Sequence, residues 1–490
     1  MKRGSLVLLP LFLLTPALDP APPSFTALQP ELLGLGTSFT NAVADYDGDG
    51  DLDLFVGFGG VANRLYRNDA GTLTDVGVAS GVAIPRATRS AAWADYDGDG
   101  DPDLLVGYAP GPTSVLTLFR NDRGTFTDVT ADAGLSVATG GVRQFSFVDI
   151  DGDNDLDLFV AFRDRANMLF RNDRAAFSEV AESLGLADAR KSVGALWVDA
   201  DEDGDLDVLV ANQDGDANAL FRNDGARFTD VAGAMGVEWG GRAPSLATNG
   251  TVRPCAADVN GDGRFDLFFA NYGPNGLLLK RDSTFVDVSA EWGVSVDGRY
   301  DACAFSDMDH DGTLDLYVNG TVTGGTSYPD FLFRNTGRAY SDVTPANLKA
   351  LHADHGVVWF DIDRDGDEDL SLTGAQANGM HLVMRNDLAP VDARRSLSVR
   401  VVDRRGRATR AGAEVRLYAE GTRTLLGTRL VDTGSGYNAQ NELPVHFGLA
   451  EMGAVDVEVI WPAGNRRRMT RVRNVAPQRH AGSYLTVKVR

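Results

Sequence analysis

The stretch Asp45-Tyr46-Asp47-Gly48-Asp49-Gly50-Asp51-Leu52-Asp53 decides the fold of this chain, and it runs on into the apolar residues Leu54-Phe55-Val56. Its form is D-x-D-x-D-G-x-x-D followed by an apolar run, and it occurs seven times at a spacing of roughly 50–60 residues. Repeats of that length are typical of β-propellers and other repeat arrays. The other six copies are residues 95–103, 149–157, 199–207, 258–266, 307–315 and 361–369.

The spacing of the acidic residues predicts a cation site in each copy. Oxygens at positions 1, 3 and 5 converge only where the backbone curls tightly, so position 6 favours Gly, and Asn154 replaces it in the third copy. Position 7 offers its carbonyl and position 9 returns a carboxylate. A set of six to eight oxygens at about 2.3–2.6 Å suits Ca²⁺ rather than zinc or magnesium. The sequence therefore predicts about seven calcium ions.

The predicted side-chain ligands stand at positions 1, 3, 5 and 9 of each loop. They are Asp45, Asp47, Asp49 and Asp53; Asp95, Asp97, Asp99 and Asp103; Asp149, Asp151, Asp153 and Asp157; Asp199, Asp201, Asp203 and Asp207; Asp258, Asn260, Asp262 and Asp266; Asp307, Asp309, Asp311 and Asp315; Asp361, Asp363, Asp365 and Asp369. The predicted carbonyl ligands at position 7 are Asp51, Asp101, Asp155, Asp205, Arg264, Thr313 and Asp367.

The residues around each loop predict strands rather than helices. An EF-hand needs Glu at position 12 and a following helix, whereas position 12 of the first copy is Val56 within a short apolar run. The same gaps in seven copies disfavour the alternative of merely acidic, solvated turns. Each repeat continues with an aromatic segment ending in Arg-Asn-Asp, as at 118–122, and then a Thr-Phe-Thr-Asp-Val segment, as at 125–129. Four short strands per repeat predict a β-propeller blade.

These patterns divide the chain into domains. The seventh repeat lacks its last strand, and Ser24-Phe25-Thr26-Ala27-Leu28 supplies a match at the other end, so we expect the N-terminal strand to complete the seventh blade. The fold class is all-β: a seven-bladed propeller over residues 24–388, a linker at 389–395, and a small β-sandwich or barrel over 396–490 with alternating apolar and polar residues. This last domain is locally basic, which predicts a solvated face, with docking onto the acidic propeller as the alternative.

Composition indicates an exported protein. The net charge of −23 and the pI of about 4.6 make nucleic acid a poor partner. Met1-Lys2-Arg3 and the apolar run at 6–18 predict a signal peptide over residues 1–21, and no second apolar run predicts a membrane span. We expect a monomer that is secreted or held at the cell surface, with the periplasm as a further possibility.

The two cysteines leave two alternatives open. Cys255 and Cys303 stand three and four residues before their loops, which places them on opposite strand faces and favours buried free thiols over a disulfide. The six histidines show no clustering in the sequence, and His310, at position 4 of the sixth loop, is expected to face solvent.

The motifs resemble those of a known family. The loops with their Leu-Phe-Arg-Asn-Asp and Thr-Phe-Thr-Asp-Val segments resemble FG-GAP/VCBS repeats of integrin α-subunit propellers. The segments 434–441, 446–449 and 461–464 resemble an ASPIC/UnbV domain, and together these motifs resemble the cartilage acidic protein family, in its bacterial form. The resemblance implies calcium ligands at positions 1, 3, 5, 7 and 9. Asn260 departs from that pattern with a neutral oxygen, which implies a weaker fifth site.

Three functions remain as hypotheses. The first is an extracellular binding or adhesion module without catalytic activity, whose partner is a protein or a glycan. The propeller mouth opposite the calcium loops would be lined by residues six positions before each loop, and a mostly basic ring there suits an acidic glycan or peptide. The second is a polysaccharide lyase or hydrolase, although the carboxylates are committed to metal and no catalytic motif is present. The third is a structural scaffold at the cell envelope. The predicted ring residues are Arg89, Arg143, Asp301 and His355.

Overall fold

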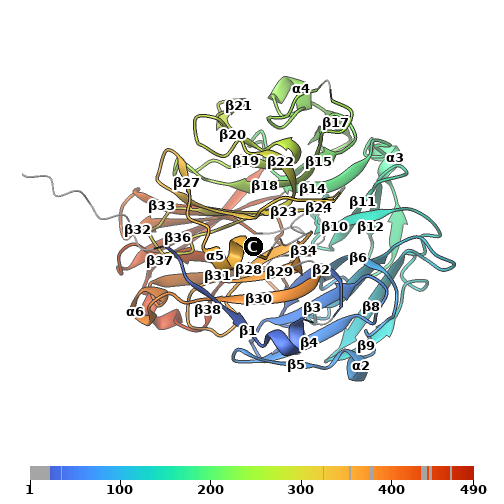
Figure 1. Ribbon diagram of the computed structural model, residues 1–490, viewed down its shortest axis with the longest axis horizontal. Helices are drawn as coiled ribbons and strands as arrows, with labels where there is room; N and C mark the ends of the chain where they lie inside the picture. Colours follow the sequence, from blue (N-terminus) through green and yellow to red (C-terminus); the bar gives the residue numbers. More distant parts are fainter. Residues whose placement is uncertain are drawn as a thin grey trace, which may run out of the picture.

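The chain folds into a ring of small β-sheets with a second β domain at its C-terminal end (Figure 1). The computed structural model describes residues 22–34, 36–244, 246–323, 325–351, 355–375, 379–431, 439–440, 444–463 and 466–490. The predicted signal peptide therefore lies outside the described residues, as does most of the 434–441 motif. Among the residues described, no helix has the length and apolar character that crossing a membrane requires.

Each of the first six repeats contributes four antiparallel strands that pair with one another. Successive strands pair through short turns, so each set is built from local contacts. In chain order these six sets are β2 (Ser38–Ala44), β3 (Asp53–Phe58), β4 (Arg64–Asp69) and β5 (Thr72–Asp75); β6 (Thr88–Ala94), β7 (Asp103–Tyr108), β8 (Leu116–Asp122) and β9 (Thr125–Asp128); β10 (Val142–Val148), β11 (Asp157–Phe162), β12 (Met168–Asn172) and β13 (Phe177–Glu179); β14 (Ser192–Val198), β15 (Asp207–Asn212), β16 (Ala219–Asn223) and β17 (Phe228–Asp230); β18 (Gly250–Ala257), β19 (Asp266–Pro274), β20 (Gly276–Arg281) and β21 (Thr284–Asp287); β22 (Asp297–Ser306), β23 (Asp315–Gly320), β26 (Phe331–Asn335) and β27 (Tyr340–Asp342). In the described residues, pairing of β19 with β22 joins the fifth and sixth sets into one eight-stranded sheet, and β34 (Ala439–Gln440) adds a fifth strand to the first set.

The seventh set joins the two ends of the repeat region. β28 (Val357–Phe360), β29 (Asp369–Ala375) and β30 (Met380–Asn386) are followed in the sheet by β1 (Phe25–Leu28), which pairs antiparallel with β30. Figure 1 shows this dark blue strand beside the orange β30. The first strand of each sheet contacts the first strand of the next, and β28 contacts β2, so the sheets form a closed ring. The prediction of a β-propeller is confirmed.

Large aromatic side chains fill the spaces between neighbouring blades. The ring of Trp93 on β6 lies 6.2 Å from that of Tyr46, which belongs to the preceding blade. Trp359 of β28 lies 6.4 Å from Tyr317 of the preceding blade, and Phe25 of β1, in the same blade as Trp359, lies 6.1 Å from it. These side chains are at most 5% exposed. Burying rings of this size supplies much of the free energy that holds the blades together.

The remaining elements are short connections. A small hairpin pairs β24 (Val322–Thr323) with β25 (Thr326–Ser327). The helices that the structure describes are α1 (Pro30–Leu33), α2 (Gly77–Ser80), α3 (Ala181–Leu184), α4 (Ala232–Met235), α5 (Ala346–Lys349), α6 (Pro390–Ala393) and the 3₁₀ helix η1 (Pro477–His480).

The C-terminal domain packs two sheets around its own core. One sheet has the order β35-β31-β38 and the other β33-β32-β36-β37, and Val399, Val415 and Val457 are fully buried between them. A two-residue strand, β34, leaves this domain and pairs in parallel with β2 of the propeller. The strands are β31 (Ser396–Val402), β32 (Glu414–Ala419), β33 (Leu425–Leu430), β34 (Ala439–Gln440), β35 (Val445–Gly448), β36 (Val455–Pro462), β37 (Arg467–Val475) and β38 (Tyr484–Lys488).

The cysteines form a disulfide, so the preference for free thiols was wrong. Cys255 on β18 and Cys303 on β22 are joined across the fifth and sixth blades, with their Cα atoms 6.3 Å apart. The prediction failed because adjacent blades pack face to face. Two residues that meet between blades must then lie on opposite faces of equivalent strands. Their distances from the loop that follows must therefore differ by one residue, as those of Cys255 and Cys303 do. A disulfide is typical of oxidising compartments and is consistent with an extracellular location.

Candidate metal centre

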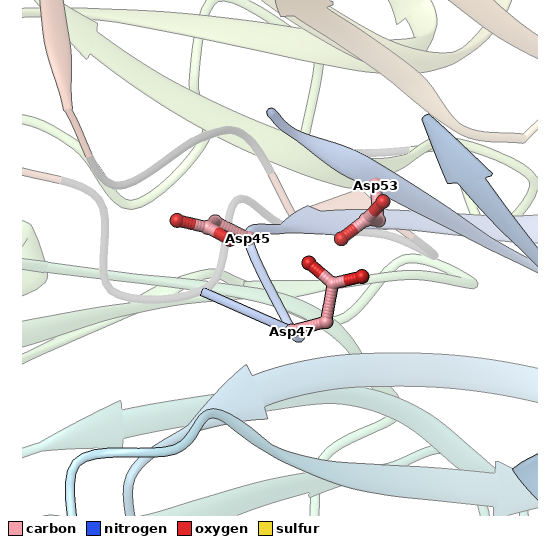
Figure 2. Close-up of side chains that lie close together, drawn as sticks. All are labelled: Asp45, Asp47 and Asp53. Carbon is pink, nitrogen blue, oxygen red and sulfur yellow. The ribbon is translucent and has the colours of Figure 1, made fainter. Parts of the chain in front are cut away.

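The seven acidic loops occupy the same place in every blade, between the first strand and the second. Position 9 of each loop is the first residue of the second strand, as Asp53 is of β3. Figure 2 shows the carboxylates of Asp45, Asp47 and Asp53 gathered where the loop joins these strands, and one oxygen of each lies within 4.8 Å of the others. The same closeness holds for Asp95, Asp97 and Asp99; Asp149, Asp151 and Asp157; Asp199, Asp201 and Asp203; and Asp307, Asp309 and Asp311.

Two residues in each loop take the left-handed backbone conformation. Position 6 has the positive φ that its Gly predicts, 93° at Gly50, and Asn154 adopts it with φ of 74°. Position 4 is also left-handed, at 75° in Gly48, which the spacing alone did not predict. The two reversals turn the acidic side chains inward, and backbone amides bond them there. Asp49 N, for example, donates to Asp47 Oδ1 over 3.3 Å.

The carboxylate at position 9 ties the loop to the rest of the blade. Asp103 accepts hydrogen bonds from Tyr96 N in its own loop, at 3.1 Å, and from Asn121 N on the third strand, at 2.8 Å. Burial raises the pKa of Asp103 to about 8. The same two N–H donors, from position 2 and from the third strand, serve Asp53, Asp157, Asp207, Asp266, Asp315 and Asp369.

Several loop oxygens fit a cation because nothing in the protein satisfies them. Both carboxylate oxygens of Asp95 are buried and accept no hydrogen bond. The same holds for Asp199 Oδ1 and for one oxygen each of Asp45 and Asp361, whereas Asp199 Oδ2 lies 3.1 Å from Arg467 Nε. Leaving buried acceptors without a partner costs free energy, and more when they are charged. Burial also raises the pKa of Asp95 to about 6. A divalent cation would supply the missing partner and favour the charged form of these groups.

The Asn that follows Arg at the end of the third strand makes a contact between blades in five repeats, which the sequence did not predict. Asn121 Nδ2 donates to Tyr46 O, which is position 2 of the loop in the preceding blade, over 2.8 Å. Its Oδ1 accepts from Gly124 N at 2.7 Å. In the fifth repeat Lys280 stands in its place, and its Nζ reaches Ala200 O. The recurrence of this Asn in the sequence indicates a role, but the sequence could not show its acceptor, which belongs to another repeat. The equivalent cross-blade bonds come from Asn68, Asn172, Asn335 and Asn386.

We expect Asp103→Ala to destabilise the protein by about 3 kcal/mol even without calcium, because two buried N–H groups lose their acceptor. Urea unfolding of the variant and of wild type, both in excess chelator, measures this loss of unfolding free energy. Asp101→Ala at position 7 is the matched control, since its side chain accepts no hydrogen bond that the structure describes, and it should change stability by less than about 0.5 kcal/mol. Equal losses for the two variants would show that position 9 has no such role.

Comparison with known protein families identifies the repeats and the C-terminal domain. Residues 25–106, 149–210, 199–269 and 258–318 match the FG-GAP-like repeat, and together they cover more than half of the chain. The chain belongs to the FG-GAP-like repeat family. Residues 404–481 match the domain described as ASPIC and UnbV. Both assignments agree with the resemblance that the motifs showed.

The chain is also similar to cartilage acidic protein 1. It is 29% identical to the Mus musculus protein, over 72% of this chain and 56% of the relative, and 31% identical to the Homo sapiens protein, over 53% and 39%. The chain thus spans about half the length of the curated relatives that it matches. A solved rhamnogalacturonan lyase is 13% identical over 72% of each chain, with a TM-score of 0.40, which is too low to transfer an activity.

The ASPIC and UnbV domain packs against the loop side of the FG-GAP propeller, as the alternative prediction of docking had it. Of the basic residues for which a solvated face was predicted, Arg467 contacts the propeller, whereas Arg404, Arg405, Arg466 and Arg468 are exposed. Arg410 Nη1 lies 3.3 Å from Asp149 Oδ2, and Arg467 Nε lies 3.1 Å from Asp199 Oδ2. Gln440 on β34 bonds the backbone of Trp93 through both atoms of its amide. The charges of the two domains suggested docking, but the sequence could not show which residues pair, because these arginines lie more than 200 residues from their partners.

His310 is buried under the same domain, which corrects the expectation that it faces solvent. Its side chain is fully buried, its Nδ1 lies 2.9 Å from Asp392 O, and its ring lies 5.2 Å from that of His446. His446 Nε2 in turn donates to Gly366 O of the seventh loop. Two of the histidines that looked scattered in the sequence therefore meet where the domain covers the FG-GAP loops.

The predicted ring at the opposite mouth is brought together in part. His355 Nδ1 lies 3.1 Å from Asp301 Oδ2, and the guanidinium of Arg89 lies 4.8 Å from the Phe39 ring, which is itself 5.0 Å from the His355 ring. Phe39 stands six residues before the first loop, the same offset as the others. The predicted ring omitted it because that prediction considered polar and charged side chains. The contacts that the structure describes do not include Arg143 in this cluster.

Backbone irregularities explain why this offset matters. The pairing of the first two strands shifts register around Phe39, Arg89, Arg143 and Asp301, so each of these residues is an extra residue that pairs with nothing on the next strand. Such β-bulges re-aim a side chain and are frequent near binding sites. The same shift occurs at Val193 and Val252, so six of the FG-GAP blades carry it.

Proposed function

We propose that this chain is a secreted, calcium-stabilised FG-GAP propeller that acts as an extracellular binding or adhesion module. The propeller over residues 24–388 would carry about seven Ca²⁺ ions in its loops, and the domain over 396–490 would cover them. The observation that carries the calcium proposal is the set of buried loop oxygens without a hydrogen-bond partner. An ion bound in a loop would lock the first two strands of its blade together, giving a rigid platform for a partner.

The partner is proposed to bind at the mouth opposite the calcium loops. Phe39, Arg89, Asp301 and His355 come from four consecutive blades around the ring, and the contacts described above link them. Arg89 offers a guanidinium beside an aromatic ring, a pair that suits a carboxylate- or sulfate-bearing group with an apolar face. An acidic glycan or an acidic peptide is therefore the ligand class that this surface fits best.

We expect Arg89→Ala to weaken binding of an acidic ligand at least tenfold, the loss of one charge-assisted hydrogen bond, while the melting temperature stays within a few degrees of wild type. A glycan and acidic-peptide array, followed by titration of any ligand found, measures the effect. Asp49→Ala should do the reverse, lowering the melting temperature and leaving affinity at saturating calcium nearly unchanged.

Arg67→Ala is the matched control, because Arg67 lies on the third strand, β4, and its ion pair in the described part of the chain is with the exposed Asp69. If Arg89→Ala and Arg67→Ala bind alike, the partner does not use this mouth. The same array also tests catalysis, since release of shortened glycan products would replace the binding proposal with a polysaccharide-active enzyme.

A further inference from the structure

The third acidic loop differs from the other six in two ways. It is the loop whose position 6 is Asn154 rather than Gly, and it is the loop that receives two arginines from the C-terminal domain. Arg410 donates from Nη2 to Asn154 Oδ1, and its Nη1 lies 3.3 Å from Asp149 Oδ2. The sequence anomaly and the docking contact therefore fall on the same side chain.

A second arginine reinforces this contact. Arg407 Nη2 donates to Asn154 O over 3.2 Å, and its Nη1 lies 3.8 Å from Asp155 Oδ1. Asp403 holds Arg407 in position, since Arg407 Nε donates to Asp403 Oδ2 at 3.0 Å. The side chains of Arg407 and Arg410 are only 10% and 12% exposed. Water therefore screens their two positive charges less than it would screen charges at the surface.

These contacts occupy position 1 of the loop more fully than in the other loops that the structure describes. Backbone N–H groups also donate to Asp258 and Asp307, and Asp199 Oδ2 lies 3.1 Å from Arg467 Nε. The third loop differs because one arginine contacts both its position 1 and the side chain at position 6. Asp149 Oδ1 accepts from Gly152 N, while Oδ2 accepts from Asn154 N and faces Arg410. Asp95, its counterpart in the second loop, has no partner at either oxygen. A divalent ion in the third loop would have to displace Arg410 from Asp149, and it would lie beside two guanidinium groups of like charge.

Charge distribution favours the docking over long range as well. Residues 396–490 contain 15 Arg and one Lys against eight Asp and Glu, whereas the whole chain has a net charge of −23. The C-terminal domain is thus a cationic body placed on an anionic face, and opposite potentials of this kind steer and orient association.

We propose that the third loop is a guanidinium receptor, in which Arg410 with Arg407 takes the place of calcium and anchors the C-terminal domain to the propeller. The loop would then bind calcium only when the domain lifts, so calcium and docking oppose each other at this loop. The competition between calcium and Arg410 rests on the proposed calcium function. The anchoring of the C-terminal domain rests on the contacts of Arg407 and Arg410 alone.

Calcium counting on the full chain tests the competition. Equilibrium dialysis at saturating calcium, with metal analysis, compares wild type with Arg407→Ala/Arg410→Ala. The double variant should bind one ion more per chain. The matched control is Arg473→Ala/Arg479→Ala, which removes the same charge from exposed positions without described side-chain contacts, and it should bind the wild-type number. Equal numbers in all three proteins would overturn the competition while leaving the proposed calcium function intact.

Hydrogen exchange in chelator tests the anchor without calcium. Asn154→Gly restores the residue found in the other loops, suits the φ of 74°, and removes the acceptor of Arg410. Amides in 403–413 should then exchange about tenfold faster, while those in the β6 strand keep their wild-type rates. Unchanged exchange in 403–413 would overturn the anchor. A chain that binds no calcium in any variant would refute the proposed function and the competition, yet this exchange result would still decide the anchor.

Discussion

Removing calcium should lower the melting temperature of this chain by tens of degrees. Ions that bind only the folded loops stabilise the native state by RT ln(1 + [Ca²⁺]/Kd), about 2.7 kcal/mol for each site at a hundredfold excess over Kd. Several loops filled at once would add more than about 10 kcal/mol, which is comparable with the whole stability of an ordinary domain. Calorimetry or circular dichroism with and without chelator measures this shift.

The physical reason lies in the bare loops. Burial raises the pKa of Asp53, Asp157 and Asp207 to about 8, because these carboxylates are removed from water among other acidic groups. A divalent cation removes this penalty. Chelator already saturated with calcium is the first control and should leave the melting temperature unchanged. Magnesium is the second and should restore little, since it demands smaller, octahedral coordination. An identical melting curve in excess chelator would refute calcium stabilisation.

The second large effect concerns the disulfide. Replacing both cysteines, Cys255→Ala/Cys303→Ala, should destabilise the protein by about 4 kcal/mol, the chain-entropy cost of releasing the loop that the bond closes. The sequence separation is 48 residues, so the bond restrains a whole blade in the unfolded chain. Both positions are buried, and Ala avoids placing a hydroxyl in the core. The shift of the urea midpoint measures the effect.

Reductant provides the control for the disulfide prediction. Reductant should not change the urea midpoint of the double variant, which has no cysteine left. Wild type that is unfolded and refolded in reductant should show a urea midpoint close to that of the double variant. A double variant that unfolds at the wild-type midpoint would show that packing between the fifth and sixth blades, rather than the bond, holds this junction.

Contacts between blades mark the limit of what sequence can predict. Offsets of three and four residues looked incompatible for Cys255 and Cys303, yet facing blades bring opposite strand faces together. The alanines and aromatics of neighbouring inner strands obey the same rule, as Ala42 and Trp93 do in one shared cluster. The rule follows from the arrangement of the blades and could not be derived from one strand. For the same reason the sequence could not predict that Asn121 donates to Tyr46 O in the preceding blade.

Residues close together in the chain were enough to determine the repeat, the β-propeller class and the family, because a nine-residue loop and its flanking strands encode their own conformation. The positive φ at Gly50 and Asn154 and the start of β3 at Asp53 are local consequences of that pattern. The tertiary structure alone decided the disulfide, the burial of His310, the cluster around Phe39 and the placement of Arg407 and Arg410 on the third loop. Each of these depends on closing the ring and seating the second domain on it, and no local pattern carries information about partners that lie a blade or a domain away.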